Sequence, residues 1–473
     1  MSANLFPPLL HRRRALSRIA CGFGATAAAA MLGEESAAAG VDPMAPKRPH
    51  FVPRAKRVIF LFLHGGISHV DTFDEKPELN KRNGQPVPFK KPDFEFAVTG
   101  NLLGSPWKFH SHGQSGLRIS ELFPRIGSVI DDICVVNSIS GGNEVSHGPA
   151  CLRLNTGDGV LNRPSLGAWT LYGLGSDNRD LPGFITLTPS IYHGGTQNFG
   201  SAFLAASFQG TSIGDGNAEF PRTAAVSNVV PGRPRAVQRR QLDLLATANR
   251  EYLVETGADA RLEARIRAFE TAFRMQTAIP EVFDLSQESK ETLALYGIGG
   301  GPTDEYGREC LMARRLAESG VRFIQVNHSY PRNYWDAHGG LRANHSKNAM
   351  KIDQPIAALI TDLKRRGLFD DTLVVLGTEF GRTPAAQGSD GRDHHPHAFS
   401  MLMAGGGVRG GMKYGETDEF GYYVAKNMVS IPDLHATILH LLGLDHQRLT
   451  FRHAGRDFRL TDVEGEVIRE ILA

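Results

Sequence analysis

The stretch "GRDHHPHAF", residues 391–399, concentrates side chains that bind metal ions or carry protons. It holds an arginine, an aspartate and three histidines, and it leads directly into the apolar run Phe399–Met403. Imidazole and carboxylate groups are the ligands that zinc and harder divalent cations take in proteins. The stretch is therefore either a polar surface loop or one part of a metal site.

Three other apolar runs predict buried strands, and polar loops rich in acidic and histidine residues follow them: Val58–Leu63, Phe323–Val326 and Leu373–Leu376. Ligands of open α/β sheets bind beyond the carboxyl ends of the strands, so we expect these loops to converge at one edge. The candidate metal ligands at that edge are Asp71, Asp336, His338, Glu379, His394 and His395. The alternative is a polar edge held together by hydrogen bonds without a metal.

Helical segments separate the predicted strands. Ile352, Ile356 and Leu363 recur at helical spacing, and Gly367 is suited to end that helix. The alternation predicts an α/β fold with a mostly parallel central sheet sandwiched by helices. Residues from about 230 to 300 are instead charged and amphipathic, which predicts a helical insertion whose charged residues form a solvated face.

The N-terminal residues 1–39 are typical of an export signal. Arg12, Arg13 and Arg14 precede a weakly apolar stretch that ends in small residues. The consecutive arginines and the mild apolar core resemble a twin-arginine signal, which predicts a periplasmic or extracellular protein. We expect the folded domain to span residues 46–473. The alternative is a disordered alanine-rich tail.

The composition excludes several classes of protein. The 473 residues are 41% hydrophobic and 22% charged, as in ordinary globular domains. A formal charge of +2 argues against a nucleic-acid partner. No apolar run is long enough for a transmembrane helix in the mature chain. Cys134, Cys151 and Cys310 have no metal-type spacing and do not form a disulfide framework, and we expect Cys151 in the core.

Several motifs together resemble the alkaline phosphatase superfamily, which includes sulfatases, phosphopentomutases and cofactor-independent phosphoglycerate mutases. "TEFGRTP" is similar to the Asp-His-Gly element of that superfamily, with Glu379 in the acidic place. "GRDHHPHAFSMLMAG" is similar to the Gly-x-Asp-His of the mutases, which implies that His394 is the late metal ligand. "IPDLHATILHLLGLD" is similar to the C-terminal helix of the sulfatases.

The closest resemblance covers nearly the whole mature chain. The stretches "GGISHVDTFDEKP", "GTEFGRTP" and "LHATILHLLGLDHQRLTFRHAGRDFRLTDV" resemble the exported, sulfatase-like bacterial proteins grouped as domain of unknown function 1501. The resemblance implies a divalent metal, either zinc, calcium or manganese. It also implies metal-dependent hydrolysis of a sulfate or phosphate ester, carried by a small molecule or a glycan.

The sequence departs from the superfamily at two places. Phe380 stands where the superfamily usually has histidine, which weakens one metal position. The sulfatase signature Cys-x-Pro-x-Arg is absent, and "GGNEVSHGPACLRLNTG" takes its place. These departures favour the alternative function, a non-catalytic exported binding or assembly protein that retains the fold.

The replacing segment still offers catalytic groups. Ser146 is a candidate nucleophile, and His147 is a candidate ligand or attacking group. The alternative is that Ser146 or Asn143 caps the helix that follows, a role that is compatible with Ser146 as nucleophile. Arg382 or Arg392 would stabilise negative charge on the transferring group, because a planar cation suits a tetrahedral anion.

Overall fold

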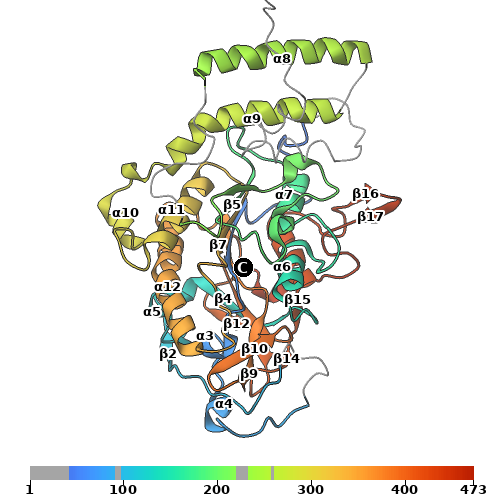
Figure 1. Cartoon of the computed structure of the whole chain (residues 1–473). Helices are drawn as coiled ribbons and strands as arrows, with labels where there is room; N and C mark the ends of the chain where they lie inside the picture. Colours follow the sequence, from blue (N-terminus) through green and yellow to red (C-terminus); the bar gives the residue numbers. More distant parts are fainter. Residues whose placement is uncertain (1–41, 91–96, 220–232, 257–259) are drawn as a thin grey trace, which may run out of the picture.

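A nine-stranded sheet forms the centre of the computed structural model, which describes residues 42–90, 97–219, 233–256 and 260–473 (Figure 1). The strand order is β12-β4-β11-β8-β1-β7-β5-β6, and β15 also pairs with β4. The strands are β1 (Arg57–Leu63), β4 (Ile133–Ser140), β5 (Phe184–Leu187), β6 (Thr211–Ile213), β7 (Phe323–His328), β8 (Thr372–Gly377), β11 (Phe399–Ala404), β12 (Met412–Tyr414) and β15 (Val429–Ser430). The expected export signal, residues 1–39, lies outside the described residues.

The sheet is mostly parallel, which confirms the predicted fold class. Strand β1 pairs in parallel with β7 and with β8, so that Val58 lies between Phe323 and Leu373. Strand β11 runs antiparallel to both β4 and β8. The four apolar runs identified in the sequence are β11, β8, β1 and β7, which are neighbours in this order. Their polar loops are therefore brought close together.

Alternate residues of β1 pack into two different cores. Ile59 belongs to one hydrophobic core together with Leu311 and Ile356, whereas Phe60 belongs to the other together with Leu439. Figure 1 shows α11 and α12 on one side of the sheet and α6 and α7 on the other. The covering helices are α5 (Pro124–Gly127), α6 (His147–Thr156), α7 (Leu166–Leu174), α11 (Asp304–Glu318), α12 (Leu341–Arg365) and α13 (Ile431–Leu441).

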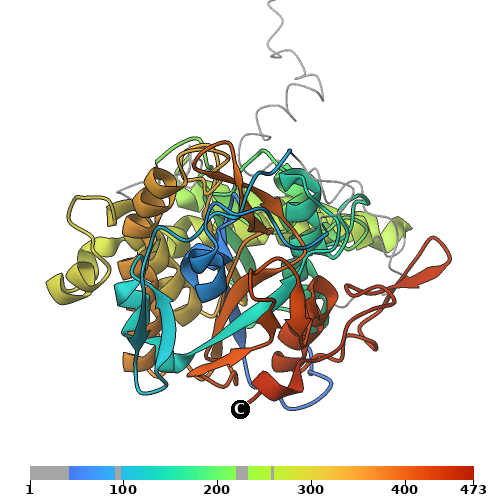
Figure 2. The ribbon, with the colours of Figure 1, turned by 90° about the horizontal axis from the view of Figure 1, so that it is seen from below.

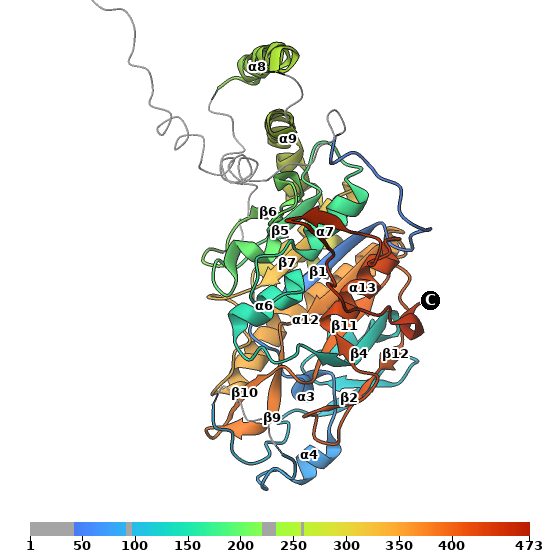
Figure 3. The ribbon, with the colours of Figure 1, turned by 90° about the vertical axis from the view of Figure 1, so that its right-hand side faces the viewer.

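Further helices and hairpins surround this sandwich. Helices α8 (Arg235–Thr256), α9 (Ala260–Phe283) and α10 (Lys290–Leu295) lie in the range that the sequence marks as a helical insertion, and α8 and α9 are stacked at one end of the molecule (Figure 3). The smaller elements are α3 (His69–Thr72), α4 (Pro77–Lys81), β2 (Phe109–His112), β3 (Leu117–Ser120), β9 (Gly381–Gln387), β10 (Gly391–His395), β13 (Glu416–Thr417), β14 (Val424–Lys426), β16 (Phe451–His453) and β17 (Arg456–Phe458). The β16–β17 hairpin projects from the body (Figure 2). Among the described helices, none combines the length and the apolar character needed to cross a membrane.

Candidate metal centre

The candidate site lies where the carboxyl ends of the central strands meet α6 and the β9–β10 hairpin. His64 directly follows β1, and Glu379 follows β8 after one intervening residue. His147 is the first residue of α6. The stretch that looked like a loop in the sequence is strand β10, whose His394 lies opposite Arg382 of β9. The hairpin thus carries both side chains to the edge of the sheet.

Asp336 lies at the centre of one half of the site, where it contacts three histidines. Its Oδ1 lies 3.1 Å from His338 Nε2 and 3.3 Å from His394 Nε2, and its Oδ2 lies 3.5 Å from His147 Nε2. The guanidinium of Arg382 donates to Oδ1 from 2.5 Å. Three imidazoles from different parts of the chain therefore converge on one carboxylate.

Glu379 lies at the centre of the other half of the site, next to His147 and His64. The side chain is buried, and its Oε1 accepts hydrogen bonds from His147 Nδ1 at 2.6 Å and from the backbone N–H of Gly65 at 2.8 Å. His64 Nε2 lies 4.0 Å from the same oxygen and 2.9 Å from His193 Nδ1. His147 joins the two halves because it contacts both carboxylates.

The electrostatics keep the two carboxylates ionised. Burial raises the pKa of Asp336, but the contacts with His147, His338 and His394 outweigh it and lower the pKa well below its ordinary value. Burial likewise opposes ionisation of Glu379, yet the hydrogen bond from His147 and nearby imidazoles lower its pKa to about 2. Two negative charges are therefore fixed in a site that contains several imidazoles.

The histidines are mostly held in the neutral form that binds metals. Burial lowers the pKa of His64 and of His394 to about 4. His147 and His338 differ. Burial opposes protonation of His147, but its contacts with Asp336 and Glu379 raise its pKa, and the hydrogen bond to Asp336 raises that of His338. The neighbouring carboxylates therefore favour positive charge at these two positions.

The orientation of His394 fits a metal ligand. Its Nδ1 donates to the backbone carbonyl of Val145 at 2.6 Å, so its Nε2 presents a lone pair. That lone pair faces a carboxylate oxygen of Asp336 and lies 2.9 Å from His338 Nε2. Two ligands of one zinc ion are separated by roughly 3.0 to 3.4 Å, given bond lengths near 2.1 Å. The donor set is thus arranged as a cation requires.

The structure provides three groups of ligand atoms, and within each group the atoms lie within 4.8 Å of one another: His147, Asp336 and His394; His338, Asp393 and His394; and His64, Cys151 and Glu379. The first two share His394 and describe one region around Asp336. The third group includes Glu379 itself and lies on the side of that residue that faces His64. Four of the residues predicted as ligands therefore lie together, namely Asp336, His338, Glu379 and His394.

Asp71 and Arg392 do not belong to these groups, which corrects two sequence predictions. Both side chains are fully buried, and Arg392 donates to the two oxygens of Asp71 at 2.7 and 3.1 Å. Ser68 donates a further hydrogen bond to Asp71 at 2.6 Å. With both oxygens occupied, Asp71 is not placed to bind a metal, and Arg392 is not placed to reach a substrate. The pair holds α3 against β10.

His395 is also directed elsewhere. Successive residues of a strand point to opposite sides, so His394 and His395 of β10 cannot both face the metal groups. His395 Nε2 donates to the carbonyl of Tyr422 at 2.5 Å, and its ring stacks with that of His69. His397 is half-buried and contacts the rings of His395 and Tyr423. The histidines of this hairpin therefore divide by role.

Ser146 and Arg382 lie at the site but differ from expectation. Ser146 occupies the N-cap position of α6, with φ −107° and ψ 139°, but its side chain makes no capping hydrogen bond. Ser146 therefore lies at the predicted cap position without the capping hydrogen bond, and its side chain is exposed to solvent. Arg382 is fully buried and donates to the carbonyls of Gly65 and Gly66 as well as to Asp336. It positions Asp336 rather than facing solvent.

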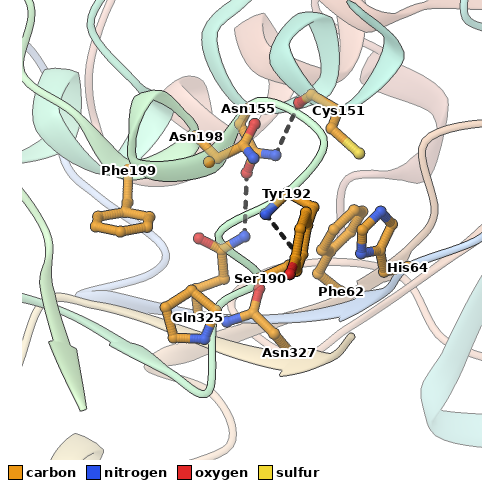
Figure 4. A pocket seen from close by; sticks show the side chains of 12 residues that line it. Phe62, His64, Cys151, Asn155, Ser190, Tyr192, Asn198, Phe199, Gln325 and Asn327 are labelled. Atoms are coloured by element: carbon orange, nitrogen blue, oxygen red, sulfur yellow. Dashed lines mark hydrogen bonds between the residues drawn. The ribbon is translucent and has the colours of Figure 1, made fainter. Parts of the chain in front are cut away.

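Three residues that we did not predict as site residues belong to the site. His64 follows the first predicted strand without any intervening residue, a signal that could have identified it. Cys151 was expected in the core; it is buried, and its sulfur is directed towards His64 (Figure 4). His193 lies in a coil segment with no motif around it, so no local signal identifies it. Its φ of 51° places it in the left-handed region.

A pocket adjoins the His64 side of the site (Figure 4). About 280 Å³ of empty space adjoins the side chains that line it, but this includes open solvent, and the enclosed part has room for little more than one water molecule. Its lining combines amide and aromatic side chains and includes no Asp, Glu, Lys or Arg: Phe62, His64, Cys151, Asn155, Pro189, Ser190, Tyr192, Gly195, Asn198, Phe199, Gln325 and Asn327. The pocket is thus polar but uncharged next to a strongly charged cluster.

Phe380 is fully buried, and its ring faces the site rather than a distant core. Its centroid lies 4.8 Å from that of His147 and 4.5 Å from that of His394. We expect Phe380→His to raise the affinity for a divalent metal about tenfold or more, because it adds an imidazole beside existing ligands. Isothermal titration of the metal-free protein with zinc measures this. Phe380→Leu, which removes the ring without adding a ligand, serves as the control; an unchanged affinity in the histidine variant contradicts the expectation.

The comparison with protein families gives one match, to the family described as "Protein of unknown function (DUF1501)", over residues 55–472. This is the family that the sequence motifs resembled. Among curated proteins, none matches the sequence significantly.

The comparison with solved structures gives matches at low sequence identity. The lipoteichoic acid synthase LtaP from Listeria monocytogenes is 10% identical, with a TM-score of 0.40, and the match covers 89% of this chain and 79% of that one. A protein in the alkaline phosphatase superfamily from Vibrio parahaemolyticus is 11% identical over 92% and 76%, with a TM-score of 0.35. The PsFucS1 sulfatase from Pseudoalteromonas sp. is 10% identical over 83% and 68%, with a TM-score of 0.33. At these scores the likenesses do not identify a substrate.

Proposed function

The chain belongs to the DUF1501 family, and we propose that it is a metal-dependent hydrolase of sulfate or phosphate esters. One observation carries the proposal. The lone pair of His394 Nε2 faces a carboxylate oxygen of Asp336 at 3.3 Å, with His338 Nε2 only 2.9 Å away. Atoms that all accept hydrogen bonds repel one another unless protons or a cation lie between them. A divalent cation, either zinc, calcium or manganese, satisfies this arrangement.

The residues around Asp336 take distinct roles in this proposal. Asp336, His338, His394 and His147 would hold the cation, which would polarise the ester oxygen and lower the pKa of an attacking hydroxyl or water. The carbonyl of Val145 fixes the tautomer of His394. Arg382 holds Asp336 in place through its hydrogen bond. His64, Cys151 and Glu379 form the candidate second position.

The reacting ester would lie at the start of α6. Ser146 precedes His147, its side chain is exposed, and it makes no capping bond, so its hydroxyl is the candidate nucleophile. The N-terminal end of a helix carries partial positive charge and unpaired N–H groups, which favour a phosphate or sulfate group there. The ester would be carried by a small molecule or a glycan. Residues 1–39 would direct export through the twin-arginine route.

Metal analysis combined with an ester assay tests the proposal. We expect the purified protein to retain or take up at least one zinc, manganese or calcium ion, and to hydrolyse p-nitrophenyl phosphate or p-nitrophenyl sulfate only with metal present. His394→Ala should lose both properties. His397→Ala is the matched control, since its ring lies in the same segment but faces Tyr423. Absence of any metal, together with no hydrolysis of either ester, would favour a non-catalytic binding protein instead.

A further inference from the structure

Helix α8 (Arg235–Thr256) stands at one end of the molecule and packs on α9 (Figures 1 and 3). Arg239 fixes its orientation by donating to both oxygens of Glu270 at 2.8 and 2.6 Å and by packing over the ring of Phe273. Leu242 and Ala246 are half-buried on the same side of α8. One face of α8 therefore packs against α9, and the adjoining face is exposed.

The exposed face carries a stripe of apolar side chains. Val237 is 42% exposed, Leu244 73%, Leu245 47% and Tyr252 52%. Together with the exposed Ala248, they recur at helical spacing and so share one broad face of the helix, which the exposed Gln241 interrupts. Scattered single apolar residues are ordinary on protein surfaces, but several on one face are typical of a contact surface. The sequence alone had suggested a solvated charged face for this segment.

We propose that this stripe binds the same stripe of a second copy of the chain, with the two α8 helices antiparallel. Leu244 and Leu245 lie at the middle of α8, where a two-fold axis would cross it. When Leu244 of one copy contacts Leu245 of the other, symmetry provides the reverse contact as well. The same register places Val237 beside Tyr252 of the second copy.

The charges beside the stripe favour this partner and this direction. Arg240 and Glu251 are exposed and lie on the same flank of the stripe, at similar distances from the middle of α8 but towards opposite ends. Antiparallel pairing brings Arg240 of each copy close to Glu251 of the other, which gives two attractive pairs. Parallel pairing would place the same flanks on opposite sides of the seam, so that Arg240 and Glu251 would not meet and both attractive pairs would be lost. Electrostatic complementarity of this kind sets the orientation of helices that pair through an apolar seam.

The oligomeric state of the purified full chain tests the proposal. We expect light scattering after gel filtration to report a dimer at tens of micromolar concentration, a typical range for interfaces of moderate size. The double variant Leu244→Glu/Leu245→Glu should be monomeric, with an unchanged circular dichroism spectrum. The matched control is Val160→Glu/Leu161→Glu, which changes two adjacent exposed residues outside α8, 82% and 53% exposed, and should remain dimeric. A monomeric wild-type protein, or a dimer that survives the α8 change, overturns the proposal.

A charge exchange tests the register. Arg240→Glu and Glu251→Arg should each weaken dimerisation by about tenfold, because each change replaces two attractive pairs with two repulsive ones. The combined variant Arg240→Glu/Glu251→Arg should recover the wild-type affinity, since the exchanged charges attract again across the axis. Failure to recover rules out antiparallel pairing.

Binding of the wild-type chain to vesicles with anionic headgroups, lost in Leu244→Glu/Leu245→Glu, would assign the stripe to a membrane surface and would also overturn the proposal.

Discussion

Replacing Asp336 by asparagine is expected to abolish most metal binding and to lower ester hydrolysis by at least about a hundredfold. Asp336 is the only carboxylate that contacts His147, His338 and His394 together among the described residues. Removing a residue that merely supports a metal ligand costs roughly 10- to 100-fold, so losing a central ligand should cost more. Metal content by mass spectrometry and kcat/KM on an aryl ester measure the two effects.

Asp390→Asn is the control for this change. Asp390 is an exposed carboxylate in the turn between β9 and β10, and it accepts a hydrogen bond from the backbone of Gly340 rather than from an imidazole. We expect that variant to keep metal and activity within about twofold, as for surface substitutions away from a site. If Asp336→Asn keeps its metal while Asp390→Asn behaves as wild type, Asp336 is not a ligand and the proposed centre is wrong.

Much of the fold could be predicted because it follows from short-range patterns. The four apolar runs form adjacent strands, since a strand buried on both faces reads as a continuous apolar segment. The β9–β10 hairpin was harder to recognise in the sequence. Residues 381–387 and 391–395 contain Gly, Pro and several polar residues, so they look like loops in sequence, yet they form the β9–β10 hairpin. The hairpin is also held by long-range hydrogen bonds to Gly66 after β1 and to Val145 before α6, which no local pattern contains.

The candidate site was predictable only where a strand end fixes position. Asp336 and Glu379 follow their strands and converge as the topology of a parallel sheet requires. Asp71 follows a strand as well, but it meets Arg392, which is 321 residues away in sequence. His193 approaches His64 from a segment that no motif marks. Long-range partners decide whether a strand-end carboxylate is available to a metal, and a single sequence does not reveal them.

The reassignment of Asp71 and Arg392 leads to a large expected effect on stability. Both side chains are 0% exposed and are joined by two hydrogen bonds. Breaking a buried ion pair by removing one partner leaves an uncompensated charge, which costs about 3 to 5 kcal/mol. Asp71→Asn should therefore lower the free energy of unfolding by that amount, measured by urea denaturation. The exposed pair of Arg452 and Asp457 gives the control, because Asp457→Asn should change stability by less than about 1 kcal/mol.

Metal content and pH dependence distinguish this role of Asp71 from that of a metal ligand. Asp71→Asn should retain its metal, whereas loss of metal at unchanged stability would restore the original prediction. Burial raises the pKa of Asp71, but Arg392 and Ser68 outweigh it and lower the pKa below its ordinary value of 3.8. The ionised carboxylate therefore stabilises the folded protein at pH values above 3.8, and this contribution is lost as the pH falls through the pKa of the folded state. Below pH 3.8 the stability of the wild-type protein should decrease more steeply with falling pH than that of Asp71→Asn. Parallel curves would show that Asp71 is not the ionised partner of Arg392.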